Sequence, residues 1–206
     1  MGNKKEAPLN TLQSFLPEGS YDAVMQYLLQ YKVHLTLTKE RKSLLGDYRF
    51  AVDGKNHRIS INANLNKFSF LITLLHELAH LVAFIRYGNK IAHHGKEWKS
   101  TYGEILRQFL LLNIFPPDIA AEIKATMHNP AAGSCAEDSL LRVLRRYDKN
   151  GDGKKLVEEI AEKSAFRTDD GRVFLRGELM RKRIRCIEVK TGKIYLFSPV
   201  HEVMPV

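Results

Sequence analysis

Hydrophobic and polar positions in the first third of the chain predict a helix followed by three short strands. Residues 12–31 follow a helical period that Pro17 interrupts, with the main body of the helix from Ser20 to residue 31. Residues 33–38 alternate between polar and apolar side chains, as a half-buried strand does. Residues 48–52 and 58–62 predict two more strands on either side of the Asp53-Gly54 turn. We expect a small antiparallel sheet.

The next segment is apolar on nearly every helical face. It begins at residue 66 or 67 and ends near residue 87, where Gly88-Asn89 supplies a C-terminal stop. A helix that is apolar all round belongs at the centre of a fold. Residues 96–112 and 117–127 predict two further helices, the second with Pro117 in its first turn. The pattern predicts an α+β fold.

The character of the sequence changes near residue 130. Residues 129–134 resemble a linker, a short helix is expected at 137–147, and strands are expected at 172–175, 181–189 and 193–197. We therefore expect one domain over residues 1–130 and a small, basic C-terminal α/β module over residues 131–206.

Composition narrows the class of protein. The 206 residues are 44% hydrophobic and 27% charged, which is typical of a globular protein. A net charge of +9 favours anionic partners such as DNA. The two cysteines, Cys135 and Cys186, cannot form a four-cysteine zinc site. No secretory signal is visible, and ionisable residues interrupt the one long apolar stretch, so we expect a cytoplasmic monomer without a membrane partner.

The central helix carries the segment His76-Glu77-Leu78-Ala79-His80, which has the pattern HExxH. Residues four apart lie on one helix face, so both imidazoles can bind one Zn²⁺ ion. Glu77 is offset from the ligands and can act as the general base for an attacking water. Burying two imidazoles and a carboxylate in an apolar helix without partners would be unfavourable by several kcal/mol, roughly, and a metal ion compensates for that cost.

A zinc ion in such a site needs a third protein ligand. The extended HExxH pattern that ends in a third histidine is absent, since Ala83 and Arg86 stand where its glycine and histidine belong. Glu97 and Glu104 could serve, as in sites where a downstream glutamate completes the set. The loop segment His93-His94-Gly95 is the better alternative, because the Gly88-Asn89 turn can bring it back over the motif.

These motifs resemble those of the SprT-like zinc metallopeptidases, which include the Spartan proteases of DNA–protein crosslink repair. The resemblance rests on Leu74 to His80 followed by His94-Gly95-Lys96-Glu97-Trp98, and it covers roughly residues 20–115. It implies a zincin-like minimal metallopeptidase domain with one zinc ion. It also implies His76, His80 and His94 as ligands and Glu77 as catalytic base. Trp98 itself is expected to pack in the core.

The resemblance implies a zinc endopeptidase that cleaves protein substrates, among them proteins associated with DNA. Many relatives carry a C-terminal zinc ribbon, so the module over residues 131–206 could be a degenerate ribbon without metal. The alternative is a nucleic-acid-binding adaptor with a structural zinc and no peptidase activity. A fourth protein ligand on the metal would favour that adaptor.

Two further patterns predict sites in the C-terminal part. Residues 148–153 followed by Glu159 match a calcium-binding loop, although a solvated turn would look the same. Arg181, Arg183 and Arg185 would share one face of a strand and could bind nucleic-acid phosphates. A solvated sheet face explains the same three arginines.

Overall fold

The computed structural model describes residues 9–41, 44–52, 55–131, 133, 135, 137–148 and 153–206. The chain divides into two compact units, Met1–Asp148 and Lys149–Val206. Each unit has its own cluster of buried apolar side chains. The Asp53-Gly54 turn predicted from the sequence lies outside the described residues.

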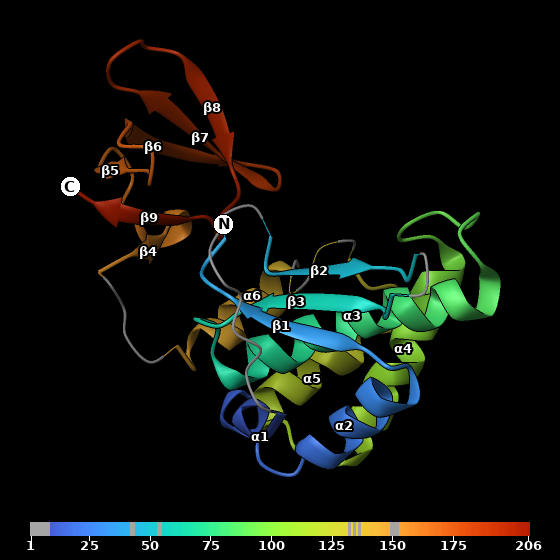
Figure 1. Ribbon diagram of the computed structural model, residues 1–206. Coiled ribbons are helices and arrows are strands. Elements are labelled where there is room, and N and C mark those ends of the chain that lie inside the picture. Colours follow the sequence, from blue (N-terminus) through green and yellow to red (C-terminus); the bar gives the residue numbers. More distant parts are fainter. Residues whose placement is uncertain are drawn as a thin grey trace. The chain divides into compact units, whose positions relative to one another are not determined.

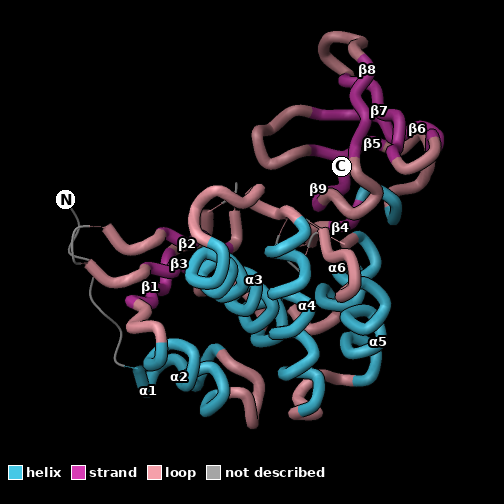
Figure 2. Tube along the Cα trace, turned by 90° about the vertical axis from the view of Figure 1, so that its right-hand side faces the viewer, coloured by secondary structure: helices cyan, strands magenta, loops and turns pink. Residues whose placement is uncertain are grey.

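The first unit is an α+β domain built around one long helix. Its elements in chain order are α1 (Leu9–Leu12), the 3₁₀ turn η1 (Gln13–Phe15), α2 (Tyr21–Gln30), β1 (His34–Thr38), β2 (Gly46–Arg49), β3 (Arg58–Asn62), α3 (Lys67–Tyr87), α4 (Lys96–Leu111), α5 (Pro117–Thr126) and α6 (Asp138–Arg145). The sheet lies along one side of α3, and α4 and α5 lie on the other (Figures 1 and 2). The helix is therefore enclosed on several sides.

The sheet is mixed, which corrects the antiparallel sheet expected from the sequence. The strand order is β1-β3-β2, in which β3 pairs antiparallel with β2 and parallel with β1. The alternation of apolar and polar side chains determines which residues face the core, but it is the same for both pairing directions. Ile59 and Ile61 of β3 point into the core and are almost fully buried.

Helix α3 is the centre of the first unit. Fifteen of its residues, from Ser69 to Ala83, are buried. It alone among the described residues is long and apolar enough to cross a membrane, but its surface is covered by the sheet and the other helices. Such burial is typical of the core helix of a soluble domain. The buried positions include those of the HExxH motif.

The first unit extends beyond the boundary expected near residue 130. Helix α6 follows that point, and its apolar residues Leu140, Val143 and Leu144 belong to the same buried cluster as α3. Asn66 links the two helices: its amide nitrogen donates to the backbone oxygen of Leu144 at 3.1 Å and to Asp148 Oδ1 at 2.7 Å. The structural division falls after Asp148 because α6 completes the core.

The second unit is a β-structure, which corrects the α/β module expected from the sequence. A six-stranded antiparallel sheet has the order β4-β9-β5-β6-β7-β8, and η2 (Val157–Glu159) is its one helical turn in the described residues. The strands are β4 (Lys155–Leu156), β5 (Ala165–Arg167), β6 (Val173–Met180), β7 (Arg183–Glu188), β8 (Ile194–Phe197) and β9 (Glu202–Pro205). The helix expected at residues 137–147 is α6 of the first unit.

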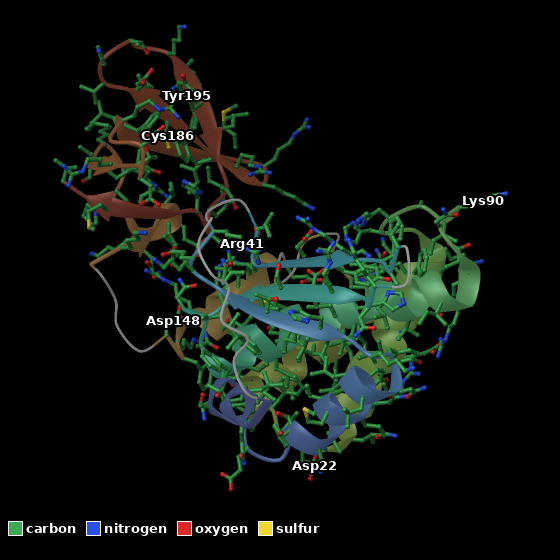
Figure 3. All side chains as sticks on the ribbon, viewed as in Figure 1. Asp22, Arg41, Lys90, Asp148, Cys186 and Tyr195 are labelled. Atoms are coloured by element: carbon green, nitrogen blue, oxygen red, sulfur yellow. The ribbon has the colours of Figure 1, made fainter. Side chains whose placement is uncertain are left out.

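Aromatic side chains fill the core of the second unit. The rings of Phe166 and Phe174 stack at 5.7 Å, and Phe197 meets both edge-on. Cys186 and Tyr195, which are paired across β7 and β8, face the same core (Figure 3). Cys186 is a free thiol, as is Cys135 in the first unit. This unit is held together by packing, without a disulfide in the described residues.

Asn66 should contribute measurably to stability, because it is the N-cap of α3. Its side-chain oxygen accepts hydrogen bonds from the backbone of Phe68 at 3.0 Å and Ser69 at 2.9 Å. We expect Asn66→Ala to lower the free energy of unfolding by about 1–2 kcal/mol, measured by urea denaturation. Asn66→Ser, which keeps a capping oxygen and loses the amide donor without placing a second carboxylate beside Asp148, should have the smaller effect. Equal losses in the two variants would contradict the capping role.

Candidate metal centre

Three histidines from two segments of the first unit meet at one point. Helix α3 places His76 and His80 one turn apart, and His94 comes from the loop just before α4, whose N-cap is Gly95. The Nε2 atoms are 3.2 Å apart between His76 and His80, 3.1 Å between His80 and His94, and 3.3 Å between His94 and His76. They form a nearly equilateral triangle of ring nitrogens.

Hydrogen bonding alone cannot account for this triangle. A neutral ring nitrogen is either a donor or an acceptor, and never both. Among three mutually contacting nitrogens, at least one pair must therefore consist of two donors or two acceptors, which repel. Four ligands placed tetrahedrally at a Zn–N distance of ~2.0–2.1 Å would lie about 3.3–3.4 Å apart. The observed spacing fits a shared metal ion.

The environment keeps these imidazoles in the neutral form that binds metals. Burial, reinforced by His94 and His93, lowers the pKa of His76 to about 3. Burial and the neighbouring imidazoles lower the pKa of His80 to about 2. The pKa of His94 is lowered too, first by burial and then by His93 and Lys99. At neutral pH no proton competes with a metal ion for these nitrogens.

Trp98 packs directly against all three histidines. Its ring lies 4.7 Å from that of His76, 5.1 Å from that of His80 and 4.6 Å from that of His94, measured between centroids. Trp98 is fully buried, and the tilted ring of Tyr102 packs against it at 5.0 Å between centroids. The expected core position of Trp98 is therefore also a position in the site. One indole restricts the orientation of all three imidazoles.

Glu77 lies beside the cluster and is 5% exposed. It lines a cleft of about 340 Å³ together with the three histidines and the segment from Leu44 to Tyr48, which leads into β2. Gly46 of β2 is close to this carboxylate: a Cβ atom there would lie 2.7 Å from Glu77 Oε1 and 2.8 Å from the methyl of Thr73. Only glycine leaves room for Glu77 in its present place. The pattern of the sequence contained no signal for this contact.

The structure distinguishes the alternatives for a third ligand. The groups able to hold a metal among the described residues are His76, His80 and His94. His93 is exposed and packs its ring on His80 at 4.3 Å. Glu104 instead accepts a hydrogen bond from Arg86 at 2.6 Å, and Glu97 is outside the cluster. His94 therefore completes the group of three side chains that could hold a metal ion.

The possible calcium loop and the three arginines predicted in the C-terminal part do not form clusters like that of the histidines among the described residues. Lys149–Asp152 of the possible calcium loop lie outside the described residues, and Glu159 accepts a hydrogen bond from the backbone of Leu156 at 2.7 Å. Arg183 and Arg185 share one face of β7, but Arg181 lies in the turn before that strand with a positive φ of 56°. The prediction that all three arginines share a strand face is wrong for Arg181.

The fold and the cluster define a class: an α+β domain with a three-histidine centre on a buried HExxH helix, next to a glutamate. A model of the SprT-like family matches residues 20–129, just over half of the chain, and this protein belongs to that family. The match ends before α6. The comparison with curated proteins found no match, and neither did the comparison with solved structures.

The two adjacent histidines should differ in their effect on metal content. We expect His94→Ala to bind zinc at least tenfold more weakly, because one of three ligands is lost. His93→Ala is the matched control and should retain the metal. Metal analysis of the purified variants after dialysis measures both. Retention of the metal by His94→Ala with loss from His93→Ala would overturn the assignment.

The metal-free protein should lose stability in acid through the same histidines. In the unfolded chain a histidine has a pKa near 6.5, whereas folding lowers the pKa of His76 and His80. Below about pH 6.5 the unfolded state therefore binds more protons, and the free energy of unfolding falls as pH falls. Each of the two contributes about 1.4 kcal/mol per pH unit until its lowered pKa is reached.

A variant isolates this contribution. Between pH 7.5 and 5.5, metal-free His80→Gln should lose about 1.4 kcal/mol less stability than the unmodified protein, since one titrating group is absent. Urea denaturation in the presence of a chelator at the two pH values measures the difference. Equal losses would show that His80 is not buried in the neutral form.

Proposed function

We propose that this protein is a zinc-dependent endopeptidase. The observation that carries the proposal is the convergence of three ring nitrogens, 3.1–3.3 Å apart, in a cleft that also contains the Glu77 carboxylate. Membership of the SprT-like family supports the same assignment. The cluster comprises three protein groups within the described residues, so a tetrahedral ion there would keep one position for water or substrate.

Zinc is the metal that this ligand set favours. Imidazole nitrogens suit zinc better than the hard cations Mg²⁺ and Ca²⁺, which prefer oxygen. The Nδ1 atom of His76 is buried without a hydrogen-bond partner among the described residues. The burial of this imidazole is therefore offset only at Nε2, the atom that points at His80 and His94. A zinc ion in such a site acidifies water and polarises a carbonyl group.

Glu77 would move the proton in the reaction. It follows His76 directly in α3, so its carboxylate is close to the ligands without being one of them. In this position it takes a proton from the attacking water and passes it to the leaving amine. The backbone of Gly46 lies close to this carboxylate, which lines the cleft. Trp98 closes the opposite side of the imidazoles to water.

Strand β2 would hold the substrate backbone. It pairs with β3 on one side and is at the edge of the three-stranded sheet. The β2 segment also lines the cleft next to Glu77. An extended peptide that pairs with an exposed edge strand is bound through its main chain, with little dependence on its side chains. This geometry supports an endopeptidase of broad sequence preference.

We propose proteins associated with DNA as the substrate class. The family resemblance and the net charge of +9 support it, because a positive charge attracts the protein to a DNA surface. Cleavage of one basic test protein, free and bound to DNA, measures the preference at two salt concentrations. Equal rates under all conditions would exclude the DNA-associated class and leave the peptidase proposal intact.

The role of Glu77 can be tested by one substitution. We expect Glu77→Gln to bind zinc as before and to lower the rate of cleavage of a fluorogenic peptide by about 10²–10⁴-fold, because an amide cannot accept the proton. Glu104→Gln is the control: it changes another carboxylate of the same domain, which is bound to Arg86 outside the cluster, and it should cleave normally. A fully active Glu77→Gln would refute the mechanism.

The same measurements separate the peptidase from the adaptor with a structural zinc. An adaptor would bind zinc and show no cleavage in the unmodified protein, so Glu77→Gln would change nothing. Metal spectroscopy with cobalt in place of zinc would then reveal a fourth protein ligand. Cleavage that depends on both zinc and Glu77 is expected only of the enzyme.

A further inference from the structure

One face of the sheet in the second unit is apolar and uncovered. The strand register shows which side chains lie on this face: Leu175 of β6 pairs with Ile187 of β7, and Ile187 pairs with Ile194 of β8. Arg185 pairs with Leu196 one step along. The backbone of Val189 donates to Val173 at 2.9 Å, which extends the face by another row. We call this surface the outer face: Val173, Leu175, Ile187, Val189, Ile194, Leu196 and the two arginines Arg183 and Arg185.

The outer face is exposed, whereas the opposite face of the same sheet is buried in the core of the second unit. Leu196 is 59% exposed, Val189 56% and Ile194 55%. On the opposite side of the same strands, Ile184, Cys186 and Phe174 are at most 1% exposed. The sheet thus has two apolar faces. Side chains of the second unit cover one of them and leave the other exposed. An exposed apolar surface that is contiguous over several strands is often an interaction site.

The charges around this face are mainly positive. Arg183 and Arg185 lie on it, and Arg167 of β5, which pairs with Val173, adds a third guanidinium at its rim. Strands β5 to β8 contain two acidic residues, Glu178 and Glu188, and Glu178 lies opposite Arg185 at the irregularity between Arg176 and Leu179. Glu188 lies on the opposite, buried face and is bonded to Thr191.

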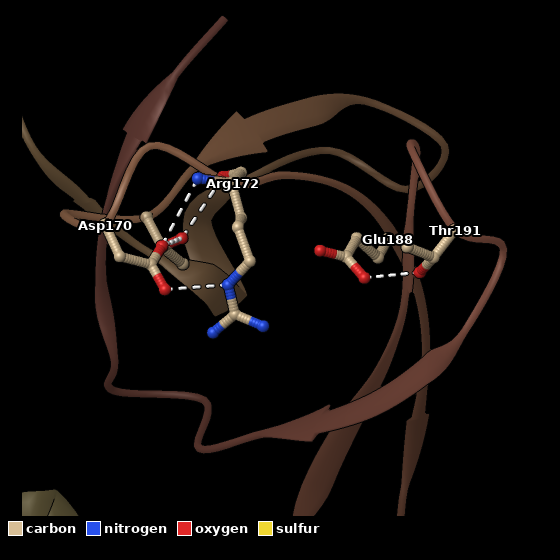
Figure 4. Close-up of polar contacts among 5 residues, drawn as sticks. Asp170, Arg172, Glu188 and Thr191 are labelled. Atoms are coloured by element: carbon tan, nitrogen blue, oxygen red, sulfur yellow. Dashed lines mark hydrogen bonds and ion pairs between the residues drawn. The ribbon is translucent and has the colours of Figure 1, made fainter.

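The turn acids nearby are also engaged. In Figure 4 the Asp170 carboxylate is bonded to Arg172, at 2.7 Å to its Nε atom. Asp169 forms an ion pair with Lys154 at 3.3 Å. The outer face therefore combines aliphatic side chains with three arginines against the one carboxylate of Glu178, and an acidic partner would be complementary to this net positive charge.

The dimensions of the outer face suit a short segment. Three or four strands spaced by about 4.8 Å and about five residues of length give roughly 300 Å². A stable dimer buries about 800 Å² on each partner, and two copies face to face would also oppose their arginines. Nucleic-acid bases stack on aromatic rings, whereas Phe166, Phe174, Tyr195 and Phe197 belong to the core on the other side.

The edge of the sheet adds main-chain recognition. Strand β8 is the last in the order and pairs with β7 alone in the described part of the sheet. An extended segment can add to such an edge and place alternate side chains beside Ile194 and Leu196. We propose that the outer face and the β8 edge bind an extended acidic segment with aliphatic side chains from a partner protein, separately from the cleft of the first unit.

Selection from a library of random 12-residue peptides, displayed on phage, tests this proposal with the full-length chain as bait. Enriched peptides should contain aliphatic and acidic residues, with acids outnumbering lysine and arginine. Their affinity, measured by fluorescence anisotropy, should fall at least tenfold with the double variant Ile194→Ser/Leu196→Ser. Arg183→Glu should weaken the acidic peptides at least fivefold and, when used as bait, shift the selection toward basic peptides.

Leu111→Ser is the matched control, because Leu111 is an exposed apolar residue of α4 in the first unit, 76% accessible. It should leave peptide affinity unchanged, and all variants should keep the unmodified melting temperature. Four results would each overturn the proposal. The first two are a selection without enrichment and enriched peptides that bind the double variant equally well. The other two are binding of anionic lipid vesicles or single-stranded DNA, and not of peptides, that the double variant loses, and a dimer of the unmodified protein that dissociates in the double variant.

Discussion

The first unit depends on one constraint: three ring nitrogens must point at a single spot inside an apolar core. That arrangement is unfavourable without an ion, since at least one contact among the nitrogens is repulsive and the rings are buried. The fold holds it because α3 is enclosed by the sheet and by α4, and because Trp98 fits against each imidazole. Binding energy of a metal would then contribute to stability, as it does wherever a site exists only in the folded state.

The sequence predicts the histidine cluster of this unit well because the motif that indicates it is local. HExxH lies within one helix, and the all-round apolar pattern placed that helix in the core, where residues 69–83 are indeed buried. The choice between His93 and His94 needed the loop geometry, which two adjacent histidines do not encode. Gly46 was missed because its role comes from a contact with Glu77, which lies in a different element far along the chain. Trp98 was expected in the core, and its contact with the ligands follows only from packing.

The errors about the strands have a common origin, because they depend on how strands pair with one another. Alternation predicted strands near β1, β2 and β3, yet the direction of β1 relative to β3 is not contained in any one strand. In the second unit, β4, β5 and β9 have two to four residues each, too few for a period-two pattern. Arg181 continued the basic run of β7, but the hairpin turns there. Helix α6 was assigned to the wrong side of the boundary because the linker-like composition precedes it, while its apolar face belongs to the core of the first unit.

The proposed function and the proposed partner site together divide chemistry and selection between the two units. A cleft that binds an extended backbone along β2 discriminates weakly among sequences, since main-chain hydrogen bonds are common to all peptides. Selectivity of the proposed peptidase must then come from bringing a suitable protein to the cleft. A second binding surface on the same chain raises the local concentration of the protein that it binds. An outer face selective for acidic, aliphatic segments would do this without altering the cleft. Gly46 illustrates how little the cleft can change beside Glu77: any larger residue at position 46 would displace the carboxylate on which the proposed reaction depends.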